Sequence, residues 1–495
     1  MQTLKSQKWK EHLNRMTSYK YFDVIIVGAG PAGLAAAHQT TKMRPNWKVL
    51  IIEKGPSLEK RDCPVKKGLE CIGCTPCRVV SGAGGAGAFS DGKVYFFRIG
   101  GYLEHEGDPL TNAFFIETVE YYFRSLFPEG LPGKELKPYL SAALESKIKK
   151  AGLTYRLTSP HHLGTENCEE FVRRIILDLQ KWDVTFSYET EAVKINLKGE
   201  MAIVECRRRG EEVIFQAPFL ILALGKGGSE WLFDQMSNLR IKPVIQPSPD
   251  IGVRIETRSE TLELLKELGG DPKLYYNRGH GTVDRVKTHC FADGGYTLLI
   301  PYENGITLVD GYSFISPEKR SGRSSVNILA RTTENISHEA WQHFLKAFKL
   351  FAKKGFPILQ RYEDFINMKP SSEEKILANS IQPTLKSYDL EDINQILVPR
   401  VTENIKEFLN RLATIIPDVV NPDTLIYAPA AEWYIPRYIP FDPKTKEGAI
   451  KHRMKPVGLN NVFTIGDGAG LSQGIVMAAT TGLFVGATIA AEMVR

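Results

Sequence analysis

The sequence has little net charge and few cysteines for its length. Of 495 residues, 63 are basic and 57 acidic, so the net charge is +6, and residues 1–20 supply most of that surplus. So small a surplus gives no basic face of the kind that binds nucleic acid, and we expect no nucleic-acid partner. The seven cysteines are an odd number. They do not resemble a secreted disulfide framework, which favours a reducing, cytoplasmic location.

Other features that the sequence lacks narrow the class of protein further. We find no internal repeat, no low-complexity tract and no apolar core of a secretory signal. One uncharged run, 471–491, is long enough to span a bilayer. It follows a GDGAG turn and contains several polar residues and glycines, so we expect a helix packed on a nucleotide-binding sheet and no transmembrane span. The basic arm, 1–21, is expected to be solvated, although contact with an acidic partner or a membrane surface stays open.

The first strong pattern is a β-strand, α-helix, β-strand unit. Residues 22–27 and 48–53 are short apolar runs that predict strands, and 34–43 predicts a helix between them. Such a unit requires a parallel sheet with a right-handed crossover. The length of the chain and its 42 glycines suit a globular protein of two or three structural units.

A dinucleotide fingerprint lies inside this unit. In VIIVGAGPAGLAAA, Gly28 permits the tight turn, Gly30 lets the backbone approach a pyrophosphate, and Gly33 lets the helix pack closely on the strand. Glu53 ends the second strand, where its carboxylate can accept hydrogen bonds from the adenosine ribose. A carboxylate there disfavours a 2′-phosphate, so the site should not prefer NADP.

The other end of the chain favours FAD over NAD. Residues 461–476, NVFTIGDGAGLSQGIV, predict a strand, a turn with Asp467 and a glycine-rich helix start. The Asp467 carboxylate can bind a ribityl hydroxyl, and the amides of Gly474 and Ile475 can face the pyrimidine edge of a flavin. An NAD enzyme does not need this second element.

Three further segments complete the predicted cofactor site. The run FLILALG ends at Gly225 and reads as a strand near the dinucleotide, and Val193 lies where a strand edge meets adenine. The glycine run 81–93 matches the fingerprint spacing without a preceding strand, so we expect it to cover the flavin or its pyrophosphate and not to form a second nucleotide fold. The predicted cofactor-binding residues are Gly28, Gly30, Ala32, Gly33, Glu53, Lys54, Gly85, Val193, Gly225, Asp467, Gly474 and Ile475.

The intervening chain predicts a second structural unit. Strand patterns return over 184–225, and 241–450 mixes strands, helices and proline-rich turns without a second fingerprint. We predict an α/β protein in which an inserted α+β substrate domain, 241–450, interrupts a Rossmann-type FAD/NAD(P)-binding domain, 22–240 and 451–495. Helices are expected at 110–126, 134–151, 166–181, 259–268, 335–353 and 402–414.

The Cys-rich loop, 63–77, holds Cys63, Cys71, Cys74 and Cys77. Four thiolates in one loop can hold zinc tetrahedrally or an iron–sulfur cluster. A redox-active thiol pair and no special role are the other interpretations. A cluster beside the flavin would relay single electrons to a protein partner, whereas zinc would only brace the loop.

Candidate acid–base residues precede the C-terminal element. His289 and Cys290 come before a predicted strand of the substrate domain, and Glu432 lies in PAAEWYIPRY with Tyr434. Either set can face the isoalloxazine. His161 and His162 are expected to cap or pack.

Together these motifs resemble a known family. The fingerprint, the Cys-rich loop, GAGAFSDGK, HLGTENCEEFV and GDGAGLSQGIV, in this order over 22–495, resemble the FAD-dependent dehydrogenases of the glutathione-reductase-like flavoproteins. The resemblance implies FAD at Gly28, Gly30, Gly33, Glu53 and Asp467, and it implies no substrate. We expect an FAD-dependent oxidoreductase that moves hydride between a small organic substrate and flavin N5, with electrons from transiently bound NAD(P)H or from another protein. The alternatives are an electron-transfer flavoprotein with a redox partner and a flavin-loaded sensor.

Overall fold

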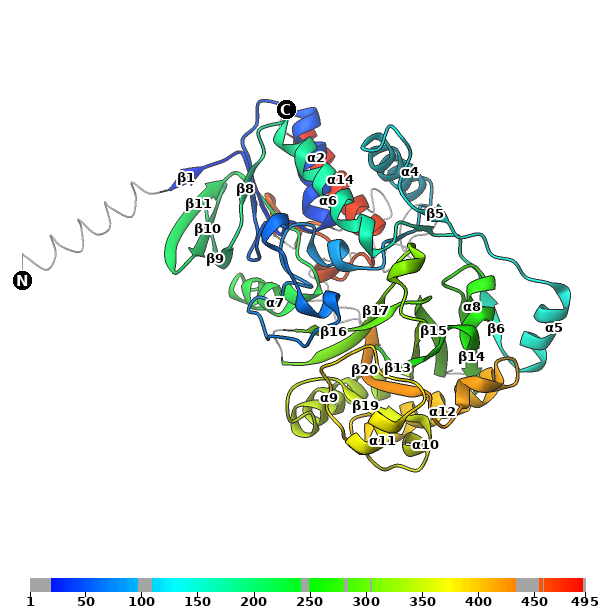
Figure 1. The fold of residues 1–495 in the computed structure, drawn as a ribbon. Helices are drawn as coiled ribbons and strands as arrows, with labels where there is room; N and C mark the ends of the chain where they lie inside the picture. The colour runs from blue at the N-terminus through cyan, green and yellow to red at the C-terminus, as the bar shows by residue number, and fades with distance from the viewer. Residues whose placement is uncertain are drawn as a thin grey trace, which may run out of the picture.

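A five-stranded parallel sheet forms the centre of the first structural unit (Figure 1). The structure is a computed structural model that describes residues 19–96, 109–241, 249–279, 284–302, 305–432, 454–456 and 458–492. The helices are α2 Pro31–Met43, α4 Pro109–Ser125, α5 Ala142–Lys150, α6 Thr165–Gln180, α7 Ser229–Asn238, α8 Glu263–Glu267, α9 Glu334–Phe351, α10 Tyr362–Ile366, α11 Glu373–Ala378, α12 Pro399–Ala413 and α14 Ile475–Glu492. The strands are β1 Lys20–Tyr21, β2 Val24–Val27, β3 Val49–Ile52, β4 Lys93–Val94, β5 Lys134–Glu135, β6 Thr154–Arg156, β7 His161–His162, β8 Thr185–Ser187, β9 Thr190–Lys198, β10 Met201–Arg208, β11 Glu211–Ala217, β12 Phe219–Leu222, β13 Asp250–Arg258, β14 Lys273–Arg278, β15 Asp284–Ala292, β16 Tyr296–Pro301, β17 Thr307–Tyr312, β18 Arg323–Arg331, β19 Ile358–Arg361, β20 Leu425–Glu432 and β21 Val462–Thr464.

The strand order of the parallel sheet is β21-β12-β2-β3-β8. Every residue of β2, β3 and β12 is buried, which is typical of parallel strands covered on both faces. In register, Ile25 lies between Leu50 of β3 and Leu220 of β12. The predicted α/β fold with a Rossmann-type sheet is therefore confirmed. Strands β2 and β21, which are more than 400 residues apart in the sequence, belong to the same sheet.

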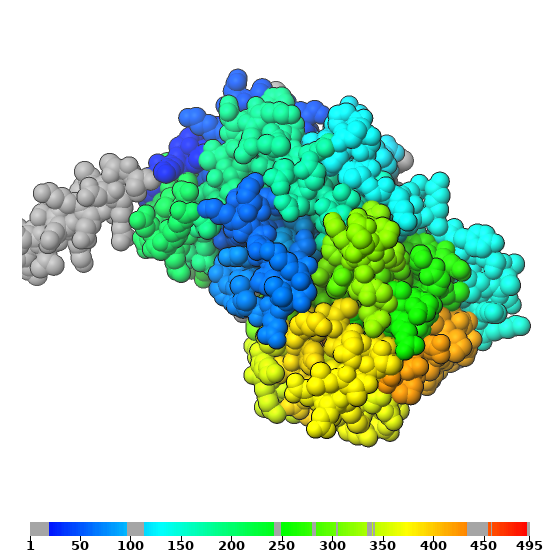
Figure 2. All heavy atoms as spheres, viewed as in Figure 1, coloured from blue at the N-terminus to red at the C-terminus, as the bar shows by residue number. Residues whose placement is uncertain are grey.

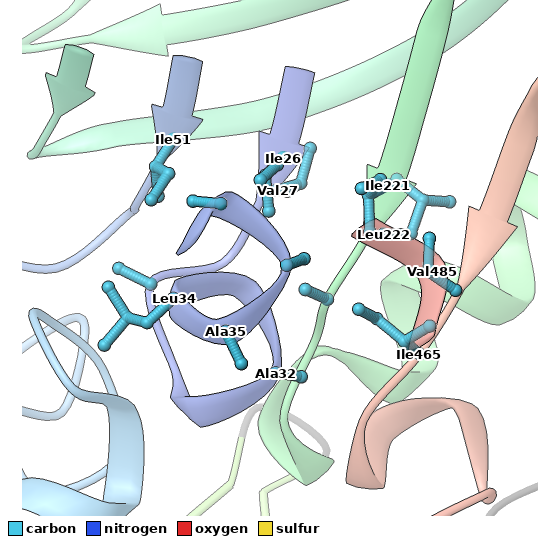
Figure 3. Packing of buried hydrophobic residues seen from close by; sticks show 14 of the residues in the cluster. Ile26, Val27, Ala32, Leu34, Ala35, Ile51, Ile221, Leu222, Ile465 and Val485 are labelled. Atoms are coloured by element: carbon cyan, nitrogen blue, oxygen red, sulfur yellow. The ribbon is translucent and has the colours of Figure 1, made fainter. Parts of the chain in front are cut away.

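Helices α2 and α14 pack with their backbones in close contact. A Cβ atom at Gly482 would lie 2.1 Å from the carbonyl oxygen of Ala32, and one at Gly486 would lie 2.7 Å from that of Ala36. Figure 3 shows Ala32, Ala35 and Val485 in the apolar layer that these helices share with the sheet. The small residues of the uncharged run therefore permit helix contact.

Helix α14 also has the length and apolar character of a membrane span. It is the one such helix in the described part of the chain, and 67% of its most apolar window is buried inside the protein. Burial against α2 accounts for its composition without a bilayer.

The second structural unit is built on a seven-stranded sheet with the order β19-β20-β13-β18-β15-β14-β6. Helix α12 packs its apolar face on this sheet and contributes Val401, Ile405 and Phe408 to the second core. Figure 1 shows α9 to α12 gathered around this end of the molecule. Strand β6, which pairs with β14, comes from the segment predicted to lie in the FAD-binding domain. The chain therefore enters the second unit earlier than the predicted boundary at 241.

Two local predictions differ from the structure. The helix expected at 134–151 is shorter, because α5 begins at Ala142 and Lys134–Glu135 form strand β5. Pro138 cannot continue a helix, and the Ser141 side chain caps α5 by accepting the amide of Leu144. The predicted basic arm, 1–21, lies mostly outside the described residues, but its last two residues pair with β11.

The segment that joins β3 to β4 covers the junction between the two units. Its side chains at Leu58, Val65 and Phe89 share a third core with Leu298 and Leu359 of the second unit. In Figure 2 this mid-blue segment lies between the first unit above it and the second unit below it. The Cys-rich loop is thus part of an interface between the units and not an isolated appendage.

Candidate active site

The fingerprint turn has the geometry that a dinucleotide requires. Gly28 has φ +110°, and a Cβ atom there would lie 2.4 Å from the carbonyl oxygen of Ala223, so only glycine fits this turn. A Cβ at Gly33 would lie 2.0 Å from the Gly28 carbonyl oxygen, which explains the close packing of helix on strand. At Gly30 the nearest atom to an added Cβ is 4.0 Å away, so this backbone borders open space at the start of α2. No side chain caps that helix, which leaves its first amides for a ligand.

Glu53 connects three backbone segments. One carboxylate oxygen accepts the amide of Ala29 at 3.0 Å, and the other accepts those of Gly55 at 2.8 Å and Gly82 at 2.9 Å. The side chain is 7% exposed and lines the cavity described below. It therefore positions the turn as well as presenting an acceptor to the cavity.

The glycine run 81–93 packs directly on this turn. The amide of Gly84 donates to the carbonyl oxygen of Ala29 at 2.8 Å. Gly85 has φ +57°, and its added Cβ would lie 3.0 Å from the Cα atom of Gly30. The run forms a short 3-10 helix over Gly85–Phe89 and no second nucleotide fold, as the sequence predicted. Its glycines are needed because two backbones meet here.

The C-terminal element faces the same space. The Asp467 carboxylate accepts the hydroxyl of Ser472 at 2.8 Å and the amide of Gly474 at 3.2 Å. Burial raises the pKa of Asp467. A Cβ at Gly474 or at Gly225 would meet no atom within 4 Å. Both backbones therefore border open space where α14 begins.

A cavity of about 610 Å³ joins these elements to the seven-stranded sheet, within the range of small-molecule and cofactor sites. Of the predicted site residues, it is lined by Gly28, Gly30, Ala32, Glu53, Lys54, Gly85, Gly225, His289, Cys290, Glu432, Asp467, Gly474 and Ile475. These residues are up to 447 positions apart in the sequence (28 to 475), and the fold brings them to one space.

Two predicted cofactor residues lie outside the lining. Gly33 is buried beneath the turn in the packing role given above. The Val193 side chain is 39% exposed, and its carbonyl oxygen accepts the indole N–H of Trp231 at 3.0 Å. Its neighbour Ala192 lines the cavity instead, because side chains alternate along β9.

The side of the cavity formed by the second structural unit holds a buried network of charges. Lys287 donates to Asp250 at 2.7 Å and to Glu432, and Arg331 donates to Asp250 at 2.5 and 3.1 Å. Burial alone would raise the pKa of Glu432, but Lys287 lowers it to about 2. Glu432 is therefore ionised at neutral pH.

His289 lies between a cation and this carboxylate. Its Nδ1 atom is 3.2 Å from the Lys273 ammonium, and its Nε2 atom is 3.6 Å from Glu432. Burial and the charges of Lys273 and Lys287 hold the pKa of His289 well below its usual value. An ammonium only donates, so Nδ1 must accept and the neutral ring carries its proton on Nε2.

Cys290 follows at a bulge in β15, between His289 and Ala292. Its φ is +49°, an unusual value for a residue with a side chain. Burial and the nearby Asp310 hold the pKa of its thiol well above the usual value. The side chain therefore presents a protonated thiol to the cavity.

The cysteines of the Cys-rich loop are all free thiols, as are the chain's three others. Burial raises the pKa of Cys63 and of Cys77. Over the described residues, no group of three or more His, Cys, Asp or Glu side chains is arranged to hold a metal ion. The geometry therefore adds nothing to the prediction of zinc or of a cluster.

Arg61 braces this loop and was not among the predicted residues. It is 6% exposed and donates to the carbonyl oxygens of Arg78 at 2.8 Å, Val79 at 2.7 Å and Ala83 at 2.6 Å. Its guanidinium lies 4.4 Å from the ring centre of Phe89. Burial lowers its pKa to about 10, so it stays charged. Nothing in the local sequence distinguishes it from a surface arginine.

Sequence reasoning also missed several basic residues that line the cavity, although the sequence carried a signal for some of them. In β15 the buried Asp284, Val286 and Thr288 alternate with Arg285, Lys287 and His289, and the second set lines the cavity. The period-2 pattern of DRVKTHC was available to predict a charged strand face. Lys226, in the turn after β12, also lines the cavity.

The parallel sheet, its fingerprint turn and the second glycine turn define the Rossmann-type dinucleotide-binding class. Comparison with protein families matches the Thi4 family over residues 7–58, which covers little more than the first strand–helix–strand unit. The comparison with curated proteins found no match. No family is assigned by these results.

Among solved structures, the chain is similar to a flavoprotein/dehydrogenase from Cytophaga hutchinsonii, with 12% identity, coverage of 96% of this chain and 79% of the other, and a TM-score of 0.38. It is similar to glycine oxidase from Geobacillus kaustophilus, with 12% identity, coverage of 94% and 93%, and a TM-score of 0.37. It is also similar to a geranylgeranyl bacteriochlorophyll reductase-like protein from Thermoplasma acidophilum, with 13% identity, coverage of 96% and 79%, and a TM-score of 0.39. These TM-scores are too low to add to the evidence of the chain's own fold.

Proposed function

We propose that this chain is an FAD-dependent oxidoreductase acting on a small organic substrate. One observation carries the proposal: the N-terminal ends of α2 and α14, each preceded by glycines, border the same cavity. This cavity extends to a charged face of the seven-stranded sheet. Two such elements suit the two halves of an elongated dinucleotide. The open backbone positions at Gly30, Gly225 and Gly474 leave the room that such a group needs.

In this proposal different residues bind different parts of the cofactor. The amides at Gly30 and Ala32 bind the pyrophosphate, with Gly28 shaping the turn and Gly85 covering it. Glu53 and Lys54 lie at the adenosine end, and Asp467 binds the ribityl chain. The N-terminal turn of α14 supplies a positive dipole end to the pyrimidine edge of the flavin. Bound FAD supplies the hydride-accepting chemistry.

The residues opposite the proposed cofactor site would bind the substrate through their charges and supply one proton. Glu432, with its lowered pKa, is a weak base that orients Lys287. His289 is the group proposed to donate the proton, through Nε2, because its neutral ring carries the proton there and lies beside that carboxylate. Cys290 is proposed as a neighbouring thiol donor. The surrounding lysines stabilise negative charge that develops on the substrate.

The source of electrons is part of the proposal. The described residues contain one fingerprint-bearing parallel sheet, so NAD(P)H would bind only transiently in the shared cavity, or electrons would come from a redox protein. We place the protein in the cytoplasm on its cysteine usage.

The first test is an anaerobic absorbance spectrum of the purified protein with metal analysis of the same sample. We expect the bands of oxidised flavin, and their bleaching by a reductant. Absence of flavin, with no recovery after addition of FAD, would overturn the proposal. Iron with acid-labile sulfide would instead favour the electron-relay alternative at the Cys-rich loop, and bound flavin without turnover of any substrate would favour a sensor.

A variant makes the test specific to the site. Gly30→Val would place side-chain atoms where the backbone now borders open space, so we expect a folded protein that no longer retains FAD. Lys42→Gln, on the exposed last turn of the same helix, is the matched control and should retain FAD. Equal FAD retention by the two variants would contradict the assignment of this turn.

A further inference from the structure

Five basic side chains of the seven-stranded sheet line the cavity, and we name them the cationic row. They are Arg156 of β6, Lys273 of β14, Arg285 and Lys287 of β15, and Arg331 of β18. Arg285 and Arg331 are direct partners in the antiparallel register of β15 and β18. The row is therefore a feature of one sheet face, held by backbone pairing and not by loop conformation.

Carboxylates pair with some members of the cationic row. Its carboxylate contacts are Asp250 and Glu432 with Lys287, Asp250 with Arg331, and Asp271 with Lys273. Glu432 is the one acidic residue of the sheet's strands that lines the cavity in the described part of the chain. Lys273, Lys287 and Arg331 thus each have a carboxylate partner.

Arg285 differs from these three residues. Within the described residues, no carboxylate lies within 4.0 Å of its guanidinium. Instead, the guanidinium lies 5.6 Å from the ring centre of Tyr275 on the neighbouring strand, which is within the range of a cation–π contact. Such a contact holds the planar group while leaving its edge N–H donors for another partner. Both side chains line the cavity.

Another part of the cavity is apolar. Leu298 and Ile300 of β16 and Leu308 of β17 line it, and these two strands pair as a hairpin. A ligand that uses both parts needs an anionic group and an apolar body. An inorganic anion would leave the apolar lining uncovered.

We infer that the substrate is an organic acid, with its carboxylate at Arg285 and an apolar body that extends along the cavity toward the β16–β17 hairpin. The inference rests on the proposed function, because it treats the sheet side of the cavity as the substrate side. A carboxylate matches the planar guanidinium with two parallel hydrogen bonds. The backbone register of β15 places Arg285 and His289 four residues apart on one strand, roughly 13 Å. The substrate must therefore be long enough to span this distance, and a shorter aromatic acid such as benzoate tests only the carboxylate end of the site.

The test is calorimetric titration of the full-length, FAD-loaded protein with three probes: benzoate, benzamide and inorganic phosphate. Benzoate and benzamide have the same apolar body and differ in charge. We expect benzoate to bind and benzamide to bind at least tenfold more weakly, because the neutral amide leaves the guanidinium uncompensated. Equal binding of the two, or binding of phosphate without benzoate, would overturn the inference.

Variants locate the site. Arg285→Gln should weaken benzoate binding by tenfold or more, and Arg285→Lys, which keeps the charge, should restore part of it. Arg258→Gln is the control, because Arg258 lies at the exposed end of β13 in the same sheet. Unchanged benzoate binding in Arg285→Gln, with the fold verified by circular dichroism, would sink the assignment.

The same samples separate this inference from the proposed function. The flavin spectrum reports whether FAD is bound, and calorimetry reports the acid independently of any turnover. A protein that holds no flavin but binds benzoate through Arg285 would refute the proposed function and retain the acid site. A protein that binds FAD but does not bind benzoate would refute the acid site and leave the proposed function standing.

Discussion

Replacing Glu432 with glutamine tests the buried charge network at the end of β20. Glu432 is 6% exposed and shares Lys287 with Asp250, whose side chain is 2% exposed. Removing one carboxylate leaves the Lys287 ammonium, whose side chain is only 12% exposed, with one of its two carboxylate partners. Breaking such a buried pair destabilises a protein strongly.

The structure also gives the size of the effect. The pKa of Glu432 falls from its ordinary 4.5 to about 2 in the folded chain. At about 1.4 kcal/mol per pKa unit, the ionised carboxylate contributes roughly 3 kcal/mol to the free energy of unfolding. Because the folded pKa is the lower one, this contribution is complete above the unfolded pKa and is lost as pH falls toward the folded one. By the same argument, the contribution of the carboxylate to the free energy of unfolding is about 2 kcal/mol at pH ~3.5.

The assay is urea unfolding of the wild type and Glu432→Gln at both pH values, with FAD at one fixed concentration because bound ligand shifts stability. The difference between the proteins should be about 3 kcal/mol at pH ~7 and smaller at pH ~3.5. Glu363→Gln is the control, since Glu363 is 49% exposed in its pair with Arg361, and it should change stability by less than about 1 kcal/mol. A Glu432→Gln protein within about 1 kcal/mol of wild type at neutral pH would refute the reasoning.

Three further outcomes follow from the packing. Gly482→Val should lower stability by about 1–3 kcal/mol or more, because its Cβ would overlap the Ala32 carbonyl oxygen at 2.1 Å; an unchanged melting temperature would contradict the helix contact. Arg61→Lys should speed proteolysis of the Cys-rich loop, since one ammonium cannot replace three directed hydrogen bonds, and equal cleavage rates would show that Arg61 does not brace it. Burial raises the pKa of Cys168 and of Cys206 to about 12, so these thiols should react with a thiol reagent at pH ~8 only after unfolding; rapid labelling of either in native protein would show that the site opens.

The parts of the site that sequence reasoning predicted are those in which a short segment determines its own geometry. The strand, turn and helix at Gly28 and the turn at Asp467 each carry their glycines and polar residues within about ten positions. Local sterics suffice to define such turns. Their meeting on one cavity was also predictable, because both follow strands expected in the same parallel sheet.

Features that depend on distant partners were not predictable. Strand β6 belongs to the second sheet only because β14 lies beside it, and its three residues carry no sign of that pairing. Val193 and Ala192 differ only in which face of β9 they occupy, and a register error of one residue exchanges them. Arg61 binds carbonyl groups of a loop whose path no local pattern describes.

The contact between α14 and α2 has a consequence for synthesis of the protein. The first strand–helix–strand unit emerges early from the ribosome, yet its sheet is closed by β21, and its helix is covered by α14, more than 400 residues later. In the meantime, the apolar surface of α2 must be shielded by other means, and the part of the cavity wall that comes from Asp467, Gly474 and the first turn of α14 is missing. Under the proposed function, the cofactor would be acquired only once β21 and α14 have been synthesised, in the step that packs α14 on α2.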